Sequence, residues 1–321
     1  MNPSKNRNEL RPLVSFILTY HNSPIDVIGS CLESIAALSL RPNEREIIVV
    51  DGGSDESLID RLTDYRDSIT YIRIKEIERS VARNIGLRMA TGTYIQFIDG
   101  GDRLASEAYE MCLDIVRYNA PDMVMFKTAE KDIPLAASQT PEPVDGAKHI
   151  MMGDVDAAAT GYIFNRRILM DLRFTPGRFY ADEEFTPLLV LRAEKLYATE
   201  ITAYRHEENM EPNDETRDKK LILSRLNDME YVLFRLNEIV PSIPRREQLA
   251  LRRYVTQLTM RYIKDTMLIT RASKQLDERL ERLKSRGLFP LPERNYTTRY
   301  SIFRMLANNR FTRKIMAAVW K

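Results

Sequence analysis

The fold of this chain is decided by residues 82–102, which read ARNIGLRMATGTYIQFIDGGD. The first half has the pattern of a helix that ends at Gly92, and the apolar run Tyr94–Ile98 follows as a short buried strand. That strand leads into a glycine-rich turn carrying Asp99 and Asp102. Carboxylates that follow a strand in this way lie at the carboxyl edge of a parallel sheet, which is where open α/β folds bind ligands.

The segments around this stretch alternate between strand and helix patterns. Four other short runs read as strands: Val14–Leu18, Glu46–Val50, Thr70–Ile74 and Asp122–Phe126. We expect one helix after Ser23, which caps it with Pro24 at the first position, and others over 56–65 and 106–118. Strands separated by helices predict βαβ units and a mainly parallel sheet, so the fold class is α/β.

The pattern changes after Phe126. Residues 127–147 predict a long excursion over one face of the sheet, and residues 160–204 return to mixed strand and helix. From about Arg217 onward, apolar residues recur at helical spacing. We therefore expect three parts, namely a polar tail over 1–10, an α/β domain over 11–210, and a helical region with a basic tail over 211–321.

Composition excludes several classes of protein. The formal net charge of 321 residues is only +2, which argues against a dedicated nucleic-acid binder. Cys31 and Cys112 provide neither a disulfide framework nor a zinc spacing, so a reduced, cytoplasmic compartment is expected. Residues 1–10 have no apolar core for a secretory signal, and no apolar run reaches the roughly 18 residues that span a bilayer.

The C-terminal tail is strongly basic. Residues 285–321 hold eight Lys and Arg residues and a single acid, Glu293. If residues 298–320 are helical, one side carries the apolar residues Phe311, Ile315, Met316, Val319 and Trp320. An apolar face with a cationic rim suits the surface of an anionic membrane. The alternative is that this face packs onto the preceding helices.

Five motifs together resemble glycosyltransferase family 2, in the order that family has them. They are Thr19–Asn22, Asp51–Ser54, Ala82–Gly86, Asp99–Asp102 and Phe179–Pro187. The resemblance extends from Val14 to about Arg205 and implies a GT-A fold, a mostly parallel mixed sheet flanked by helices, here with a helical C-terminal extension. It also implies an inverting transferase that moves a hexosyl or N-acetylhexosaminyl group from a nucleotide-sugar, most commonly a UDP-sugar.

The same resemblance assigns roles to individual residues. The implied donor-binding residues are Thr19, His21, Asp51, Arg83 and Asp99. His21 would stack on the base, Asp51 would accept hydrogen bonds from the base or ribose, and Arg83 would bind the base edge or a phosphate. Asp99 and Asp102 would hold Mg²⁺ or Mn²⁺ against the departing diphosphate. Asp182 would be the general base that takes the proton of the acceptor hydroxyl.

Three positions depart from the family pattern, and they keep an alternative open. Gly52, Gly101 and Ala181 each stand where the family has an acid. The alternative to an active transferase is therefore a catalytically impaired relative that binds nucleotide-sugars or acts as a scaffold. For Asp182 itself, the alternative role is to complement the positive N-terminus of a helix.

The helical extension suggests a partner and a place. In the family, such extensions accompany the synthesis of surface polysaccharides on lipid-linked acceptors. We expect a glycan or lipid-linked acceptor, no nucleic acid, and a cytoplasmic protein that lies peripherally at the inner face of the cell membrane.

Overall fold

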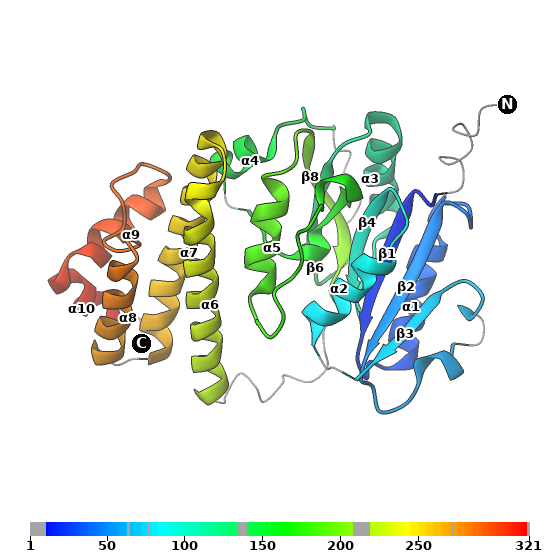
Figure 1. Cartoon of the computed structure of the whole chain (residues 1–321), viewed down its shortest axis with the longest axis horizontal. Coiled ribbons are helices and arrows are strands. Elements are labelled where there is room, and N and C mark those ends of the chain that lie inside the picture. The colour runs from blue at the N-terminus through cyan, green and yellow to red at the C-terminus, as the bar shows by residue number, and fades with distance from the viewer. Residues whose placement is uncertain are drawn as a thin grey trace. The chain divides into compact units, whose positions relative to one another are not determined.

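The computed structural model describes residues 11–62, 65–75, 78–131, 133, 140–153, 155–207, 219–270 and 273–319. The chain divides into two compact units (Figure 1). The first unit comprises Met1–His149, Asp156–Gly177 and Leu188–Met210, and the second comprises Ile150–Val155, Arg178–Pro187 and Glu211–Lys321. The expected polar tail over 1–10 and the tail residue Trp320 lie outside the described residues.

An eight-stranded mixed sheet forms the centre of the first unit, in the order β3-β2-β1-β4-β7-β6-β8-β5. The strands are β1 Val14–Tyr20, β2 Arg45–Gly52, β3 Thr70–Ile74, β4 Tyr94–Asp99, β5 Arg103–Leu104, β6 Met123–Ala129, β7 Tyr162–Asn165 and β8 Leu196–Arg205. Strands β3, β2, β1 and β4 run parallel, whereas β7 is antiparallel to both of its neighbours. The α/β class predicted from the alternating pattern is confirmed.

Helices cover both faces of the parallel strands, with α2 Arg79–Met89 in front and α1 Ile25–Ala36 behind in Figure 1. The buried side of α1 shares one apolar core with α3 Ser106–Asn119 and with alternate residues of β1, including Phe16. On the opposite face α2 lies unusually close to β1. A Cβ at Gly86 would lie 2.2 Å from Ile17 Cγ2, so only glycine permits this approach.

Three local expectations are wrong. Pro24 rather than Ser23 is the cap position of α1, and Ser23 Oγ instead donates a 2.7 Å hydrogen bond to the Gly100 carbonyl. In place of the helix over 56–65, the described residues form a 3-10 turn at Leu58–Asp60, and the Leu58 N–H donates a 3.2 Å hydrogen bond to the Tyr71 hydroxyl. Finally, α2 ends at Met89 rather than Gly92, since the next residue already has extended backbone.

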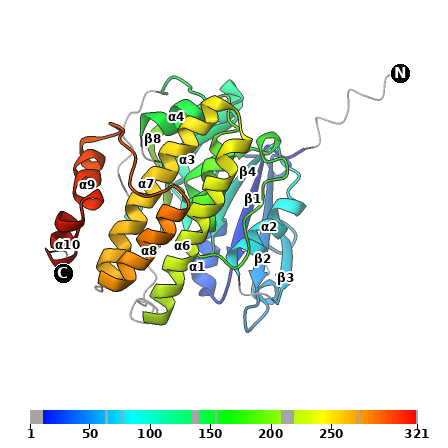
Figure 2. The same ribbon diagram turned by 60° about the vertical axis from the view of Figure 1, so that its left-hand side comes forward.

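Long helices make up most of the second unit (Figure 2). They are α6 Lys219–Ile239, α7 Arg245–Thr270, α8 Ser273–Ser285, α9 Thr298–Asn308 and α10 Arg310–Val319. Helices α4 Gly146–Met152 and α5 Ala181–Val190 each belong partly to both units. None of the described helices is long and apolar enough to cross a membrane.

One acid ties α6, α7 and α8 together. Glu230 of α6 accepts hydrogen bonds from the Tyr262 hydroxyl of α7 and from Arg279 and Arg282 of α8. The two arginine contacts are 3.2 Å and 2.7 Å. Tyr262 and Arg279 are both buried. The network therefore lies inside the helical unit, where hydrogen bonds are stronger than at the surface.

Where one tail helix was expected the structure has two, α9 and α10, and Asn309 separates them. On one side the tail packs, since Tyr300, Phe303 and Met316 are buried. Its other side is open, with the exposed apolar residues Ile302, Met305, Phe311 and Ile315. Met316, expected on the apolar face of the tail, is therefore buried, whereas Phe311 and Ile315 of the same face are exposed.

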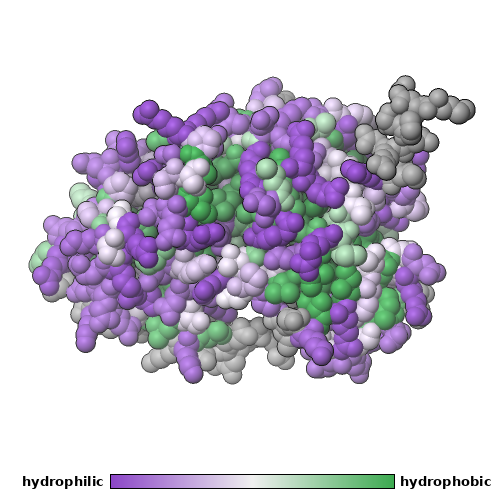
Figure 3. Space-filling view, in the orientation of Figure 1, coloured by the Kyte–Doolittle hydropathy of each residue, from purple (hydrophilic) through white to green (hydrophobic). Residues whose placement is uncertain are grey.

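Hydrophobic residues reach the surface over α2 and β3 in the view of Figure 3. Ile72 and Ile74 of β3 and Val81 and Ile85 of α2 are half-buried. β3 is the edge strand of the sheet.

Candidate active site

The carboxyl ends of β1, β2 and β4 bring several of the predicted residues to one edge of the sheet. In the strand register, Thr19 of β1 lies opposite Asp99 of β4, and Tyr20 of β1 lies opposite Asp51 of β2. The Gly100 N–H donates a 2.6 Å hydrogen bond to the Thr19 carbonyl, which holds the turn after β4 against β1. A Cβ at Gly100 would lie 2.5 Å from that carbonyl oxygen, so a side chain there would open the contact.

Three side chains bind the carboxylate of Asp99. Thr19 Oγ1 donates to Oδ1 at 3.1 Å, and Arg83 Nη2 donates to both carboxylate oxygens at 3.0 and 3.3 Å. Arg79 Nη1 lies 3.3 Å from Oδ2. Burial by itself raises the pKa of Asp99, but the two guanidinium charges and the hydrogen bonds outweigh it and lower the pKa to about 2. Asp99 is thus ionised at neutral pH, with its charge already balanced by arginines.

Arg83 is buried, with only 2% of its side chain exposed. Its guanidinium lies 5.6 Å and 5.2 Å from the ring centroids of Phe97 and Phe174. Asn84 exchanges two hydrogen bonds with the Phe174 backbone, at 2.8 and 3.0 Å, and so anchors that loop to α2. Most of the motif from Ala82 to Gly86 is thus buried in this structure, where Arg83 is bonded to Asp99.

Asp51 is fully buried and its oxygens accept hydrogen bonds from protein groups. The Ser54 N–H donates to Oδ1 at 3.0 Å, the Tyr71 hydroxyl donates to Oδ2 at 2.5 Å, and Arg73 Nε lies 3.8 Å from the same oxygen. Ser54 Oγ in turn accepts from the Asn22 N–H at 3.1 Å, which joins the turns that follow β1 and β2. Asp51 shapes this turn in the described structure.

His21 is exposed directly after β1. Its neighbour Asn22 is held in a left-handed conformation, with φ 49°, and is bonded to Asp55 through both of its side-chain amide atoms. The imidazole of His21 is thus accessible to a ligand, next to a turn that hydrogen bonds hold in place.

Asp102 has its own set of partners at the end of β8. The Tyr204 hydroxyl donates to Oδ2 at 2.7 Å, His206 Nδ1 lies 3.0 Å from the same oxygen, and the Glu207 N–H donates to Oδ1 at 3.2 Å. Tyr204 also accepts a 3.1 Å hydrogen bond from the Asp99 N–H, so it connects the two acidic positions of the turn. Between them Gly101 has φ +139°, a backbone conformation in which any L residue is strained.

Tyr204, His206 and Arg79 are site residues that the motif analysis missed. The hydrogen bond to Asp102 raises the pKa of His206, while burial opposes the rise. The sequence did offer a reason to consider His206 as a site residue, because it is one of three histidines and follows the last strand of the domain. Nothing local, however, connects it to Asp102, which lies 104 positions earlier in the chain.

The acids of this edge do not fit a preformed cation site. Among the residues that the structure describes, no three His, Cys, Asp or Glu side chains are grouped to hold a metal ion. Asp99 is bonded to Arg79 and Arg83, and both oxygens of Asp102 accept hydrogen bonds. The guanidinium groups of Arg79 and Arg83 would repel a divalent ion bound to Asp99.

Asp182 belongs to the second unit, in the first turn of α5, and is half-buried. Two acids follow it in the same turn. Glu183 bonds Tyr254 and Arg261, and Glu184 lies 3.6 Å from Arg235. Ala181, where the family has an acid, is 3% exposed. The positive end of the helix dipole favours acids at this position, whatever their further role.

Comparison with known sequences finds a family match in the first part of the chain. Residues 15–152 match the family described as Glycosyl transferase family 2. A poly(ribitol-phosphate) beta-glucosyltransferase of Bacillus spizizenii is 31% identical over 36% of this chain and 19% of its own length. The uncharacterized glycosyltransferase YibD of Escherichia coli is 24% identical over 60% of each chain. The matched segments thus span from about a fifth to three fifths of these relatives.

Comparison with solved structures identifies the fold as GT-A. S. aureus TarS superposes on 96% of this chain and 53% of its own with a TM-score of 0.66 and 16% identity. The mannosyltransferase PcManGT of Pyrobaculum calidifontis, solved with GDP-Man and Mn²⁺, superposes on 96% of this chain and 86% of its own, with a TM-score of 0.52 and 14% identity. The GT-A architecture with a helical C-terminal region, expected from the motifs, is confirmed.

Proposed function

We propose that this chain, in which residues 15–152 match glycosyl transferase family 2, moves a sugar from a nucleotide-sugar donor to an acceptor hydroxyl with inversion. The observation that carries the proposal is the cluster of Thr19, Arg79, Arg83 and Asp99 at the carboxyl edge of parallel strands. This is the edge at which open α/β sheets bind ligands. TarS has been solved with UDP-GlcNAc and PcManGT with GDP-Man, which supports a nucleotide-sugar as the donor class.

Each residue of the proposed donor site has its own role. His21, exposed on its rigid turn, stacks on the base. Asp51 supports the turn beside it, since the Ser54 N–H and the Tyr71 hydroxyl already donate to its carboxylate. Arg83 and Thr19 hold Asp99 in one orientation, and Arg79, with 63% of its side chain exposed, is the cation that a diphosphate can reach. A UDP-sugar is the preferred donor, and the sugar is a hexosyl or N-acetylhexosaminyl group.

Asp182 is the proposed general base. In an inverting transfer it takes the proton of the acceptor hydroxyl while the oxygen attacks the anomeric carbon opposite the nucleotide. A carboxylate suffices because the hydroxyl becomes acidic as the new bond forms.

Divalent metal has a reduced role in this proposal. Mg²⁺ or Mn²⁺ would neutralise the departing diphosphate, but the arginine partners of Asp99 do not fit a preformed site, and Gly101 supplies no carboxylate. Asp102, beside His206, is the remaining candidate ligand. In this proposal the side chains of the protein carry out the transfer.

The acceptor is a glycan or a lipid-linked acceptor of surface polysaccharide synthesis. Support comes from the poly(ribitol-phosphate) glucosyltransferase among the relatives. The protein acts at the cytoplasmic face of the membrane. The exposed side of the tail, where Phe311 is 72% exposed, attaches peripherally to anionic lipid.

A second candidate function is a catalytically impaired relative that binds nucleotide-sugars. It is favoured by the acids missing at Gly52, Gly101 and Ala181. Calorimetry with a panel of nucleotide-sugars, with Mn²⁺ and with EDTA, followed by release of free nucleotide in the presence of acceptor, separates the two. Binding with turnover supports the transferase, binding without turnover for any acceptor supports the impaired relative, and no binding of any nucleotide contradicts both.

A further inference from the structure

The turn between Asp99 and Asp102 has two glycines at its centre, Gly100 and Gly101. Glycine loses more conformational freedom on becoming ordered than any other residue, because no Cβ restricts its backbone. One hydrogen bond closes the turn from within, since the Asp102 N–H donates to the Asp99 carbonyl at 2.9 Å. A backbone as free as this one needs contacts from other elements to keep a single shape.

Tyr204, near the end of β8, contacts both ends of this turn with one atom. Its hydroxyl oxygen accepts a 3.1 Å hydrogen bond from the Asp99 N–H, and the same hydroxyl donates to Asp102 Oδ2 at 2.7 Å. A hydroxyl can donate and accept at once, so the two bonds do not compete. The residue is fully buried, and its ring is therefore held in place by packing.

The bond to the Asp99 N–H replaces a partner that the sheet does not supply. The Gly100 N–H donates to β1, and the backbone groups of successive strand residues point to opposite neighbours, so the Asp99 N–H points away from β1. On that side β7 pairs with β4 over Tyr94–Gln96 and stops short of Asp99. The Tyr204 hydroxyl thus takes the place of a strand carbonyl, and without it the Asp99 N–H loses this acceptor.

The chain that leaves the turn keeps it beside Tyr204. Strand β5 follows directly and pairs antiparallel with β8, where Leu104 lies opposite Tyr204. The Ala105 N–H then donates to the Ala203 carbonyl at 3.0 Å. Backbone pairing therefore fixes the position from which the hydroxyl reaches the turn.

We propose that Tyr204 is a positioning residue of the donor site and holds this turn in the shape in which Asp99 and its partner Arg79 receive a nucleoside diphosphate. The inference rests on the proposed transferase function. The buried hydroxyl acts through the backbone of Asp99 and the carboxylate of Asp102, and it does not itself touch the donor.

The size of the effect follows from the ordering of the turn. Fixing the backbone of one residue changes an equilibrium constant by roughly five- to thirty-fold. Tyr204→Phe leaves other contacts in place, among them the bond from Gly100 to Thr19 and the contact of His206 with Asp102. We therefore expect loss of the hydroxyl to weaken nucleoside diphosphate binding by about five-fold, the lower end of this range.

Amide hydrogen exchange and NMR relaxation test whether the hydroxyl holds the turn. In Tyr204→Phe, which keeps the ring, the Asp99 amide should exchange at least about ten-fold faster than in the wild type. The order parameters of the Gly100 and Gly101 amides should fall from about 0.85, which is typical of rigid backbone, towards about 0.6. Neither measurement needs a nucleotide or an acceptor.

Calorimetry with UDP and UMP tests whether the turn matters for the donor, and GDP and GMP replace them if the wild type binds GDP more tightly. In the proposed site a diphosphate reaches Arg79, whose partner Asp99 begins the turn. Tyr204→Phe should weaken UDP about five-fold and UMP by less than about two-fold, with an unchanged stoichiometry. A merely structural role would lower the fraction of competent protein, and so the stoichiometry, and would affect both nucleotides alike.

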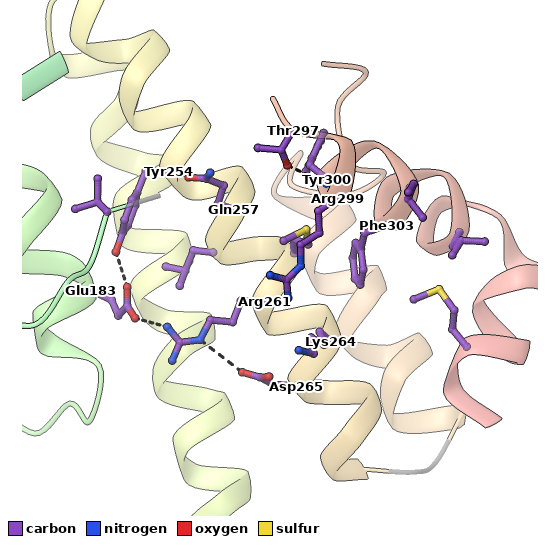
Figure 4. A pocket seen from close by; sticks show the side chains of 16 residues that line it. Glu183, Tyr254, Gln257, Arg261, Lys264, Asp265, Thr297, Arg299, Tyr300 and Phe303 are labelled. Carbon is purple, nitrogen blue, oxygen red and sulfur yellow. Dashed lines mark hydrogen bonds and ion pairs between the residues drawn. The ribbon is translucent and has the colours of Figure 1, made fainter. Parts of the chain in front are cut away.

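Tyr254→Phe is the matched control. Tyr254 of α7 is a buried tyrosine of the second unit, and its hydroxyl also donates to a carboxylate, Glu183 Oε2, at 2.5 Å (Figure 4). The variant removes the same kind of hydrogen bond outside the first unit, which holds the residues of the turn. It should leave both the exchange of the Asp99 amide and the ratio of UDP to UMP affinity unchanged.

Several results would overturn the proposal. Exchange of the Asp99 amide in the wild type as fast as that of an exposed amide removes the hydrogen bond itself, whether or not Tyr204→Phe folds. If the wild type binds UDP or GDP, an unchanged ratio of diphosphate to monophosphate affinity in Tyr204→Phe contradicts the positioning role alone. An equal change of this ratio in Tyr254→Phe makes the effect nonspecific. No binding of any nucleoside diphosphate by the wild type contradicts the proposed function, on which the role rests.

Discussion

Replacing Asp99 with asparagine removes the charge that faces Arg83 and keeps the shape of the side chain. Arg83, 2% exposed, then stays buried between Phe97 and Phe174 without its anionic partner. A carboxyl pKa lowered from 3.8 to about 2 corresponds to about 2 kcal/mol of stabilisation at neutral pH. Breaking a buried ion pair from one side costs about 3–5 kcal/mol, which Arg79 and the partial exposure of Asp99 reduce. We expect Asp99→Asn to lower the free energy of unfolding by about 2–4 kcal/mol at pH 7.

The effect depends on pH in a defined direction. Because the folded pKa of Asp99 lies below the ordinary value of 3.8, its stabilisation is fully present above that value and is lost as the pH falls towards 2. The difference between the wild type and Asp99→Asn should therefore close as the pH falls from about 4 to about 2.

Urea unfolding followed by far-UV circular dichroism measures this difference, since the only tryptophan, Trp320, is in the tail. Asp171→Asn is a control that removes a 90% exposed carboxylate paired with Arg192, and it should change stability little. In an Arg83→Met background, Asp99→Asn should cost much less, because the two residues are coupled. Wild-type stability of Asp99→Asn at pH 7, or strict additivity with Arg83→Met, would refute the reasoning.

Three further predictions concern the proposed base, the histidine and the tail. Asp182→Asn should leave nucleotide-sugar affinity within a few-fold and lower the transfer rate by a factor on the order of 10² to 10⁴, and near-normal turnover would remove Asp182 from the mechanism. Since its folded pKa is raised by Asp102, His206 should contribute stability that is full below its unfolded pKa and lost as the pH rises through the folded value. In an NMR titration, Asp102→Asn should lower the pKa of His206, and an unchanged midpoint contradicts the pairing. Full-length protein should sediment with anionic vesicles and release in high salt, whereas Phe311→Ser with Ile315→Ser should not bind; Tyr118→Ser, which changes an 81% exposed residue of α3, should bind normally.

The sequence predicted the strands correctly where a short apolar run marks them. The buried strands at Val14, Glu46 and Tyr94 occur where their apolar runs stand, and β3 has the predicted bounds Thr70–Ile74. A run of apolar residues between turn residues identifies a buried strand without knowledge of its neighbours. The alternation of strands and helices predicted the α/β class. The GT-A fold was what the resemblance of the five motifs to the family implied.

The errors occur where a tertiary contact overrides a local preference. Ser23 has the side chain of a cap, but the Gly100 carbonyl from the neighbouring strand end takes its hydroxyl. The segment from Glu56 has the composition of a helix, but its described residues form a 3-10 turn at Leu58–Asp60 instead. At Ser23 a single hydrogen bond to a distant residue competes with helix propensities worth less than about 1 kcal/mol per residue.

Sequence alone therefore determined that Asp51, Asp99 and Asp102 reach the carboxyl edge of the sheet, because a residue at or just after the end of a strand has little choice of position. Only the tertiary structure decided how each is used. It buries Arg83 under Asp99, encloses Asp51 in its own turn, and brings Tyr204 and His206 from the end of β8 to Asp102. Hydrogen bonds and ion pairs depend on distances of a few tenths of an ångström between residues up to about a hundred positions apart. Such distances are set by the packing of the whole sheet, and no local pattern encodes them.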